Sequence, residues 1–299
     1  MSLSLNCFRC AVLLLLCLSA SSSDQSTVRE TPRAAQQTDD PAVWVDRKAP
    51  AKSLIFGTVK MAAPEGAIET YSLDGKLLQR IPGVDRPNNI DVEYGLTLGG
   101  RKIDIAVVTE RNQHRLRVFE IVPGVGLKDL ASIPVFWGES GAAQQPMGIG
   151  LYRRAKDGAI FAIVSRKNGP SGSYLWQYEL KDDGKGNLAA TKLREFGVFS
   201  QTKEIEAVVV DDQLGFVYYS DEGAGIRKYH ADPAHPDAAK QLALFATTGW
   251  MGDREGLALY AGKGGRGFLV ATDQQHPDSV FHVYQREGKA GNPHDHSIE

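Results

Sequence analysis

The sequence predicts an all-β fold, and three features of its 299 residues support that class. The apolar stretches after residue 37 are short, as in Leu54–Val59, Ile160–Val164 and Phe268–Ala271, and Gly, Pro or Asp often bounds them. No long stretch repeats its apolar residues with a helical period. Glycine is abundant, at 31 of 299 residues against an average of about 7%, which suits many tight turns. Short apolar runs between turn residues are typical of strands.

The first 23 residues have the pattern of a secretory signal peptide. Arg9 precedes the apolar run Ala11–Leu18, and the small residues Ser19–Ser23 follow. The run is shorter than the roughly 20 apolar residues of a membrane span, and the leucines before Cys17 disfavour a lipid anchor there. We therefore expect residues 1–23 to be removed on secretion, which would leave a mature chain without cysteine and without a membrane anchor.

The remaining chain has the composition of a globular protein. Residues 24–37 are polar and are expected to form a linker, and residues 38–299 are expected to form one domain. Lys and Arg number 34 against 36 Asp and Glu, so the formal net charge is −2. That balance provides no basic excess for a nucleic acid. We expect a monomer that binds neither nucleic acid nor membrane.

A repeat of about 50 residues divides the predicted domain. Five predicted strands end in a three-residue pattern: Ser or Thr, any residue, then a polar or charged residue. The last residues of successive patterns lie 51, 56, 55 and 52 residues apart. The five patterns are Thr58–Lys60, Thr109–Arg111, Ser165–Lys167, Ser220–Glu222 and Thr272–Gln274. A unit of this length with three or four short strands is a propeller blade.

Five blades are visible in the sequence, and the next strand would begin beyond Glu299. We therefore expect a six-bladed β-propeller plan whose last blade is incomplete in this chain, which would then be a fragment or a truncated product. Closure with five blades is the alternative.

The blades of a propeller surround one axis, so residues at equivalent positions of successive blades are expected to lie near one another in space. One predicted ring takes a residue from the start of a strand in each blade and is largely acidic: Asp40, Asn88, Met147, Glu206 and Glu255. A second ring takes the strand ends and carries cations in its first three blades: Lys60, Arg111, Lys167, Glu222 and Gln274.

The acidic ring predicts a metal site. Two carboxylates about 4 Å apart repel by about 4 kcal/mol at an effective dielectric of about 20, and Asp253 adds a further one. Oxygen ligands without His or Cys favour Ca²⁺, and Mg²⁺ fits less well because it demands a strict octahedron. Lys60, Arg111 and Lys167 beside bound Ca²⁺ would suit the oxygens of phosphate groups. The residues leave open the alternative that these charges form a solvated rim.

Several of these segments together resemble the β-propeller phytases, a family of secreted, calcium-dependent alkaline phytases with six blades. The similarity extends from about Asp39 to Glu287, with the motifs in the family's order: Asp39–Trp44, Tyr71–Lys76, Asn88–Asp91, Ser200–Thr202 with Glu206, Asp221–Glu222 with Gly225–Ile226, Asp253–Leu257 and Gly267–Ala271.

The resemblance implies roles for individual residues. Those that match calcium-ligating positions are Asp40, Asn88, Ile90 (through its carbonyl), Glu206, Glu222, Asp253 and Glu255. Lys60, Arg111 and Lys167 match residues that contact phosphate at the cleavage site, where Glu206 also belongs. The chain departs from the family at Met61, Met147 and Asn168, and the family's final segment, with a further calcium-binding aspartate, would lie beyond Glu299.

The expected function is therefore the calcium-dependent hydrolysis of phosphate monoesters, with phytate (myo-inositol hexakisphosphate) as substrate, several Ca²⁺ ions as cofactors and metal-activated water as the attacking group. A calcium-centred propeller lactonase or esterase is one alternative, since such a site also gathers carboxylates on the axis but needs no row of cations. A non-enzymatic propeller that binds a partner is another. Separately, the segment His294–His296 is interpreted as a solvated terminus.

Overall fold

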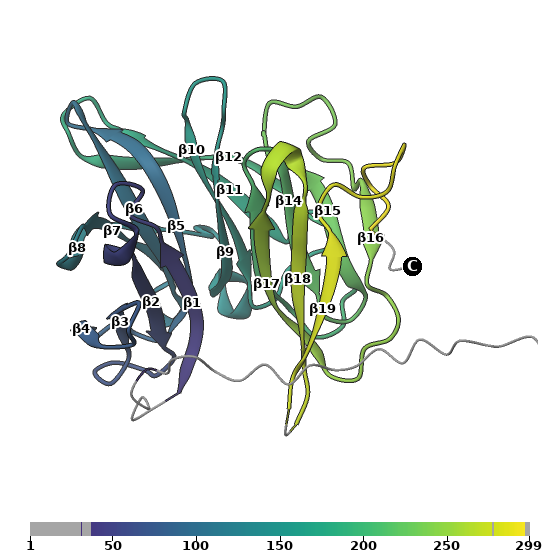
Figure 1. The fold of residues 1–299 in the computed structure, drawn as a ribbon, viewed down its shortest axis with the longest axis horizontal. Helices are drawn as coiled ribbons and strands as arrows, with labels where there is room; N and C mark the ends of the chain where they lie inside the picture. The colour runs from purple at the N-terminus through teal and green to yellow at the C-terminus, as the bar shows by residue number, and fades with distance from the viewer. Residues whose placement is uncertain (1–30, 32–36, 277, 297–299) are drawn as a thin grey trace, which may run out of the picture.

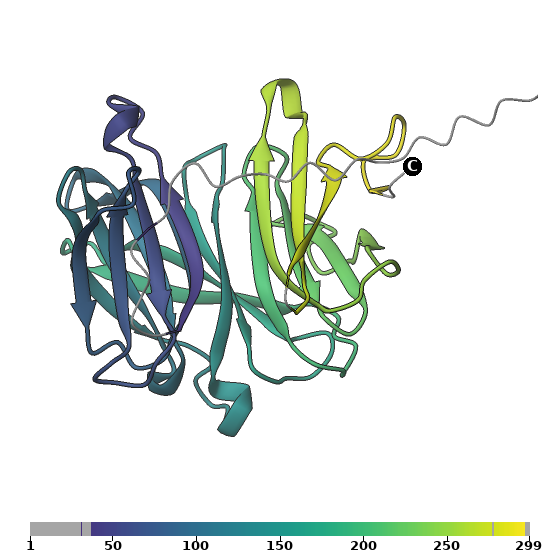
Figure 2. The same cartoon turned by 60° about the horizontal axis from the view of Figure 1, so that its bottom comes forward.

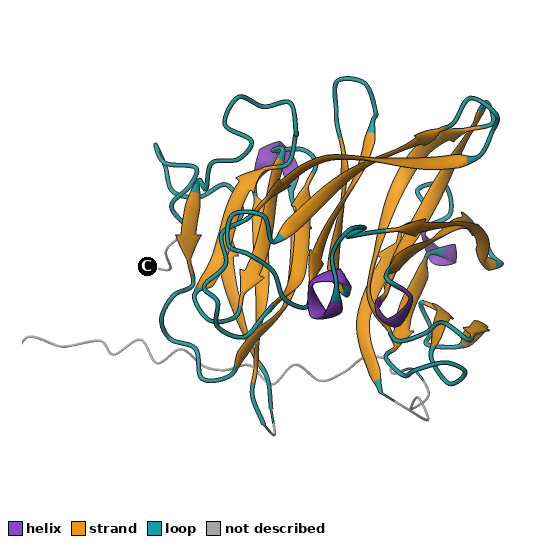
Figure 3. Ribbon diagram, turned by 180° about the vertical axis from the view of Figure 1, so that it is seen from behind, coloured by secondary structure: helices purple, strands orange, loops and turns teal. Residues whose placement is uncertain are grey.

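A computed structural model of the chain describes residue 31 and residues 37–276 and 278–296. The predicted signal peptide lies outside the described residues, as does the predicted linker apart from positions 31 and 37. The described part contains nineteen strands, four short 3₁₀ helices and no α-helix (Figure 3), which confirms the all-β prediction. None of the described helices has the length and apolarity that crossing a membrane requires.

The strands form five antiparallel sheets, each made of strands consecutive in the chain. Four sheets have four strands and the fifth has three. The first comprises β1 (Thr38–Trp44), β2 (Leu54–Val59), β3 (Ala67–Ser72) and β4 (Leu77–Pro82); the second β5 (Pro87–Leu98), β6 (Arg101–Glu110), β7 (Arg115–Val122) and β8 (Gly126–Pro134); the third β9 (Pro146–Arg153), β10 (Ile160–Arg166), β11 (Leu175–Asp182) and β12 (Leu188–Phe196); the fourth β13 (Ile205–Asp211), β14 (Phe216–Asp221), β15 (Gly225–His230) and β16 (Ala243–Phe245); the fifth β17 (Asp253–Ala261), β18 (Gly267–Gln274) and β19 (Val280–Gln285).

The five sheets are the blades of a propeller. Their first strands contact one another in order, β1 with β5, β5 with β9, β9 with β13 and β13 with β17, and so surround a common channel (Figure 1). Within the described residues, β17 and β1 do not pack together in this way and stand on either side of an opening (Figure 2). The sixth blade expected from the sequence is not among these sheets.

Apolar residues fill the spaces between successive blades. Alternation along each strand sends every second side chain to one face of its sheet, and facing residues of neighbouring sheets interdigitate. Between the first and second blades, for example, Trp44 and Phe56 lie in one buried cluster with Phe119. Similar clusters separate the second from the third, the third from the fourth and the fourth from the fifth blade. Each blade is thus held mainly by its neighbours.

A buried hydroxyl also links each blade to the next at the start of the inner strand. Thr58 Oγ1 donates to the Asn88 carbonyl at 2.8 Å, and Thr109 Oγ1 donates to the Met147 carbonyl at 2.6 Å. Two more links follow the same rule: Ser165 Oγ to the Ile205 carbonyl at 2.6 Å and Ser220 Oγ to the Arg254 carbonyl at 2.5 Å. These are the Ser and Thr residues of the sequence repeat, so the repeat marks the contacts that set the blades side by side.

The fifth blade leaves one face uncovered. Leu269 and Tyr284 pack against the fourth blade, whereas their neighbours on the opposite face, Tyr260, Phe268 and Phe281, are 67%, 47% and 65% exposed. A propeller blade normally has its apolar faces covered on both sides, and a large exposed apolar face marks an interaction site.

The interpretation of His294–His296 as a solvated terminus is wrong for His296. This side chain is buried, and its ring packs against Tyr218 and Phe245. The backbone carbonyl of Gln285 lies 2.8 Å from His296 Nδ1, and Lys228 Nζ lies 3.1 Å from His296 Nε2. The segment after β19 therefore folds back on the fourth and fifth blades, a contact that local sequence does not reveal.

Replacing Thr109 with Val should destabilise the fold. The Met147 carbonyl would lose its hydroxyl donor and the Asn89 N–H, 3.0 Å from Thr109 Oγ1, would lose its acceptor, and buried unsatisfied groups cost about 1–3 kcal/mol. Thr272→Val is the matched control, because no such link to a further blade exists for Thr272 among the described residues. Urea denaturation should show a clear loss for the first variant only. An equal loss in both would contradict the inter-blade role.

Candidate functional site

The inner strands of all five blades line one central cavity of about 1510 Å³. Its lining includes Asp39 and Asp40 from the first blade, Asn89 from the second, Glu206 from the fourth and Glu255 from the fifth. All of these residues lie at or near the starts of inner strands, so one end of the channel gathers polar and charged side chains from distant parts of the chain. This end is called the channel mouth below.

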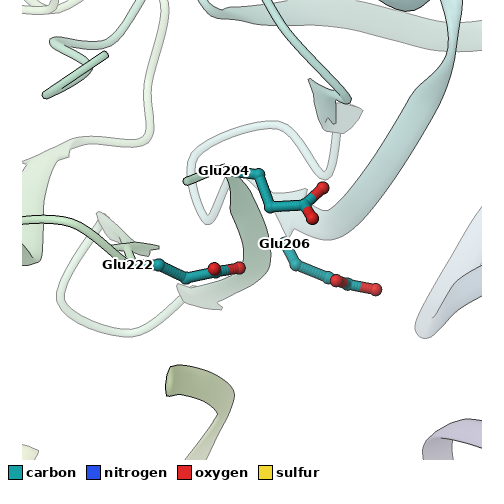
Figure 4. A group of neighbouring side chains, drawn as sticks. All are labelled: Glu204, Glu206 and Glu222. Carbon is teal, nitrogen blue, oxygen red and sulfur yellow. The ribbon is translucent and has the colours of Figure 1, made fainter. Parts of the chain in front are cut away.

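Three glutamates form an acidic cluster at the channel mouth. Glu204 and Glu206 come from the start of β13 and Glu222 follows β14 (Figure 4). Each offers a carboxylate oxygen, and these oxygens all lie within 4.8 Å of one another. Glu204 and Glu206 alternate with the buried Ile205, and residues two apart on a strand point to the same side. Both side chains therefore leave the chain on the same side, close to Glu222.

Lys60 connects this cluster to the first blade. Its Nζ lies 2.7 Å from Glu206 Oε1 and 3.0 Å from Asp39 Oδ1. Burial by itself would lower the pKa of Lys60, but the carboxylates of Glu206 and Asp39 outweigh it, and the net shift of this pKa is upward. Lys60 is therefore a fixed cation at the channel mouth.

Asn88 and Arg111 extend the network into the second blade. The Asn88 amide donates to Glu206 Oε1 at 2.5 Å, and the Arg111 guanidinium donates to Asn88 Oδ1. Arg111 is buried, and its Nε has no hydrogen-bond partner. Burial is the main cause that lowers the pKa of Arg111. Glu206 thus lies at the junction of contacts from Lys60 and Asn88.

Lys167 and Asp253, two further predicted site residues, each form an ion pair. Lys167 Nζ lies 2.6 Å and 2.7 Å from the two carboxylate oxygens of Glu204. Asp253 forms an ion pair with Lys203, in which both side chains are partly exposed. Carboxylates and cations consequently alternate around the channel mouth rather than occupying separate sides of it.

Burial, with repulsion between neighbouring carboxylates, raises the pKa of several of these carboxyl groups. Burial raises the pKa of Glu222 to about 8, with repulsion from Glu255 next in size. Burial also raises the pKa of Glu255 to about 7, with repulsion from Glu206 adding to the shift. Asp40 reaches about 8 through burial, although the Ile90 N–H donates to its Oδ2 at 2.9 Å and pulls its pKa down. These groups ionise at neutral pH only against an electrostatic cost, which a bound cation would offset.

The donor set fits a hard metal cation. The carboxylates of Glu204, Glu206 and Glu222 supply oxygen only, without His or Cys. Hard cations prefer such ligands, and a positive ion among these groups would offset the burial and repulsion that raise the pKa of Glu222. The residues of the channel mouth could therefore hold a metal ion.

The structure brings most of the predicted site residues to the channel mouth and adds others. The contacts above join Lys60, Asn88, Arg111 and Glu206 directly, while Lys167 joins through Glu204. Neither Glu204 nor Asp39 was among the residues that the sequence predicted. Both had a local signal. Asp39 is adjacent to the predicted Asp40 on β1, and Glu204 precedes the predicted Glu206 by two residues, the spacing that keeps side chains on one side of an extended chain.

A second pair of carboxyl groups, Glu93 on β5 and Asp212 after β13, lies further along the channel, and the two groups interact with each other. Glu93 is buried, and its Oε1 accepts the Tyr94 N–H at 2.7 Å. Burial, followed by repulsion from Asp212, raises the pKa of Glu93 well above its ordinary value.

These features define a class of protein: an open propeller of five blades with a channel mouth of interleaved carboxylates and cations. The chain belongs to the Phytase family, whose sequence pattern it matches over residues 18–299.

Individual relatives agree with this assignment. The chain is 34% identical over 256 residues to the 3-phytase of Bacillus subtilis (strain 168), an alignment that covers 84% of this chain. The chain spans 62% of the length of that relative.

Solved structures with little sequence similarity share the fold. One is a protein from Bacteroides uniformis described as a 6-phosphogluconolactonase, with a TM-score of 0.52 and 12% identity over 84% of this chain and 68% of that one. Another is the periplasmic gluconolactonase of Pseudomonas aeruginosa, with a TM-score of 0.50 and 15% identity over 81% of this chain and 65% of that one. At such low identity these similarities concern the propeller fold alone.

Replacing Glu93 with Gln should make the fold less sensitive to high pH. Because the pKa of Glu93 is raised in the folded chain, the native state holds a proton that the unfolded chain releases above about pH 4.3, and stability falls as pH rises toward the native pKa. The variant has no such proton to lose. Urea denaturation should therefore show a larger gain from the substitution at about pH 9 than at about pH 5.

The exposed Glu65 provides a control, and Glu65→Gln should change stability little at either pH. A Glu93→Gln effect of the same size at both pH values would contradict the raised pKa of Glu93.

Proposed function

We propose that this protein hydrolyses phosphate monoesters with the help of calcium and that phytate is its substrate. The observation that carries the proposal is the interleaving of carboxylates with Lys60, Arg111 and Lys167 at one channel mouth, in a chain that belongs to the Phytase family. The similarity to the 3-phytase of Bacillus subtilis supports the same substrate.

Calcium would bind to the carboxylates of the channel mouth. The residues assigned to it are Asp40, Asn88, Ile90 (through its carbonyl), Glu206, Glu222, Asp253 and Glu255, with Glu204 as a further ligand. When bound, calcium supplies Lewis acidity toward phosphate oxygens and water and neutralises negative charge. The irregular arrangement of the carboxylates suits calcium better than the octahedral demands of magnesium.

The cations of the chain would bind and stabilise the reacting phosphate group. Lys60 and Lys167 are held by carboxylates, so substrate oxygens would compete for their ammonium groups with Glu206 and Glu204. Arg111 would donate to phosphate from its guanidinium group, which has no carboxylate partner among the described residues. Such prearranged donors act on the charge that develops in the transition state, usually the largest single contribution to catalysis. Glu206 would keep Lys60 in place.

A calcium-centred lactonase is the principal alternative reaction, because the carboxylates gathered at the channel mouth could also serve such an enzyme. The row of cations favours a phosphate ester, since a neutral lactone offers no negatively charged oxygens for Lys60, Arg111 and Lys167 to bind. A propeller that only binds a partner would need neither calcium nor these cations. Measuring phosphate-ester and lactone hydrolysis by the same preparation distinguishes the three candidate functions: a phosphatase, a lactonase and a binding protein without either activity.

A sixth blade is part of this proposal. It would fill the opening between β17 and β1 and cover the exposed face that carries Tyr260, Phe268 and Phe281. Val43 on the facing side of β1 is 50% exposed and would be covered as well. Both faces carry apolar side chains of the kind that the other blade interfaces bury.

Secretion and the monomeric state likewise belong to the proposal. Residues 1–23 have the signal-peptide pattern, and a secreted enzyme would meet calcium concentrations high enough to fill weak sites of carboxylate oxygens, which bind at about 10⁻⁴–10⁻³ M in extracellular modules.

Removal of calcium should abolish phosphate release from phytate. A chelator would empty the channel mouth and leave its carboxylates to repel one another and the substrate. Phosphate release, measured colorimetrically with calcium phytate before and after chelation, should fall to background and recover when calcium is restored. Undiminished release in the chelator would refute the metal role, and lactone hydrolysis without phosphate release would favour the alternative reaction.

Removing the charge of Arg111 or Lys60 should depress turnover. Arg111→Gln or Lys60→Gln would remove a donor to the transferring phosphate, and the loss of one such donor typically lowers kcat about 10²–10³-fold. Lys185→Gln, in the exposed turn at the other end of the third blade, is the control of equal charge and should leave kcat unchanged. Steady-state phosphate release measures all three. Unaltered turnover in both site variants would remove these residues from the mechanism.

A further inference from the structure

Arg86 is a cation that neither the repeat nor the family motifs singled out, and the backbone places it between two of the predicted phosphate-binding segments. Its N–H donates to the Met61 carbonyl at 2.8 Å, one residue after Lys60, and its carbonyl accepts the Arg111 N–H at 3.1 Å. Its φ of 58° lies in the left-handed region that residues other than glycine rarely adopt. The position is thus fixed by contacts to both neighbouring blades.

The cations at and near the channel mouth differ in whether a carboxylate lies directly beside them. Lys60 lies between Glu206 and Asp39, and Lys167 lies against both oxygens of Glu204. Among the described residues, the half-buried Arg86 side chain has no carboxylate within 4.0 Å and no hydrogen bond. Arg111 donates only to the neutral amide oxygen of Asn88. The two arginines are therefore the cations without a directly paired acid.

The two guanidinium groups also act on each other. Besides burial, repulsion from Arg86 contributes to lowering the pKa of Arg111. Two like charges beside one another are unfavourable unless an anion lies between them. An anion with several oxygens would compensate both positive charges at once.

We infer that Arg86 and Arg111 together form a phosphate-binding subsite and that Arg86 is a substrate-binding residue of this protein. The ligand is a phosphate ester group, because its several oxygens can accept from two guanidinium forks at the same time. The inference rests on the proposed function for the identity of the substrate. The observation that Arg86 and Arg111 have no paired carboxylate is independent of that function. Arg86 binds substrate without acting on the reacting bond, so its loss should raise KM more than it lowers kcat.

The test is direct binding of myo-inositol hexasulfate, a polyanion whose sulfate esters stand in for phosphate, to the calcium-loaded full chain by isothermal titration calorimetry. Arg86→Gln should weaken binding by roughly 10- to 100-fold, the range for a lost charge-assisted hydrogen bond. Arg86→Lys should recover much of the affinity. The matched control is Arg266→Gln, an exposed arginine in the turn between β17 and β18, and it should bind as the unmodified chain does.

A second variant distinguishes a loss of binding from a loss of folding. Arg86→Gly relieves the left-handed backbone while removing the charge, so it should fold at least as well as Arg86→Gln and bind equally weakly. Binding by both charge-free variants within twofold of Arg266→Gln would overturn the inference, as would absence of binding by the unmodified chain.

Phosphate release from calcium phytate is measured with the same proteins and separates the two claims. Binding that depends on Arg86 without any phosphate release would refute the proposed hydrolysis and leave the subsite standing. Hydrolysis with a KM unchanged in Arg86→Gln would refute the subsite and leave the proposed function standing.

Discussion

The hydroxyl links between blades are the interaction on which the geometry of this protein depends. Thr58, Thr109, Ser165 and Ser220 are all completely buried, and each donates to a backbone carbonyl at the start of the next inner strand. A buried carbonyl must find a donor, so each link fixes where the following blade begins. The starts of the inner strands are also where the charged side chains lie, and the same links thereby hold the channel mouth together.

The channel mouth concentrates charge in a place where charge is costly. Glu206 contacts Lys60 and Asn88, and Asn88 in turn contacts Arg111, so groups from three blades form one connected network. Burial and mutual repulsion raise the pKa of Glu222 and Glu255. Bound cations and anions would stabilise a network of this kind, in agreement with the metal ions and phosphate groups of the proposed function.

The fifth blade borders both the opening between β17 and β1 and the channel mouth. Glu255 belongs to the channel mouth, yet its strand β17 has a neighbouring blade on one side only. The exposed Tyr260 and Phe281 lie on the face of this blade that the proposed sixth blade would cover. Completion of the ring would therefore affect the position of the carboxylates of the fifth blade first, while Lys60, Asn88, Arg111 and Glu206 lie in blades that already pack against one another.

The all-β class, the blade repeat and the residues at strand starts and ends could be predicted from the sequence, because turn residues, short apolar runs and a 50-residue period are local signals. The same repeat predicted one ring that includes Asp40, Asn88, Glu206 and Glu255 and a second that includes Lys60 and Arg111. Which charges are paired could not be predicted, since the ion pair of Lys167 with Glu204 and the unpaired charge of Arg86 depend on side chains from different strands. The burial of His296 has the same cause: its partners, Tyr218 and Phe245, lie more than fifty residues earlier in the chain.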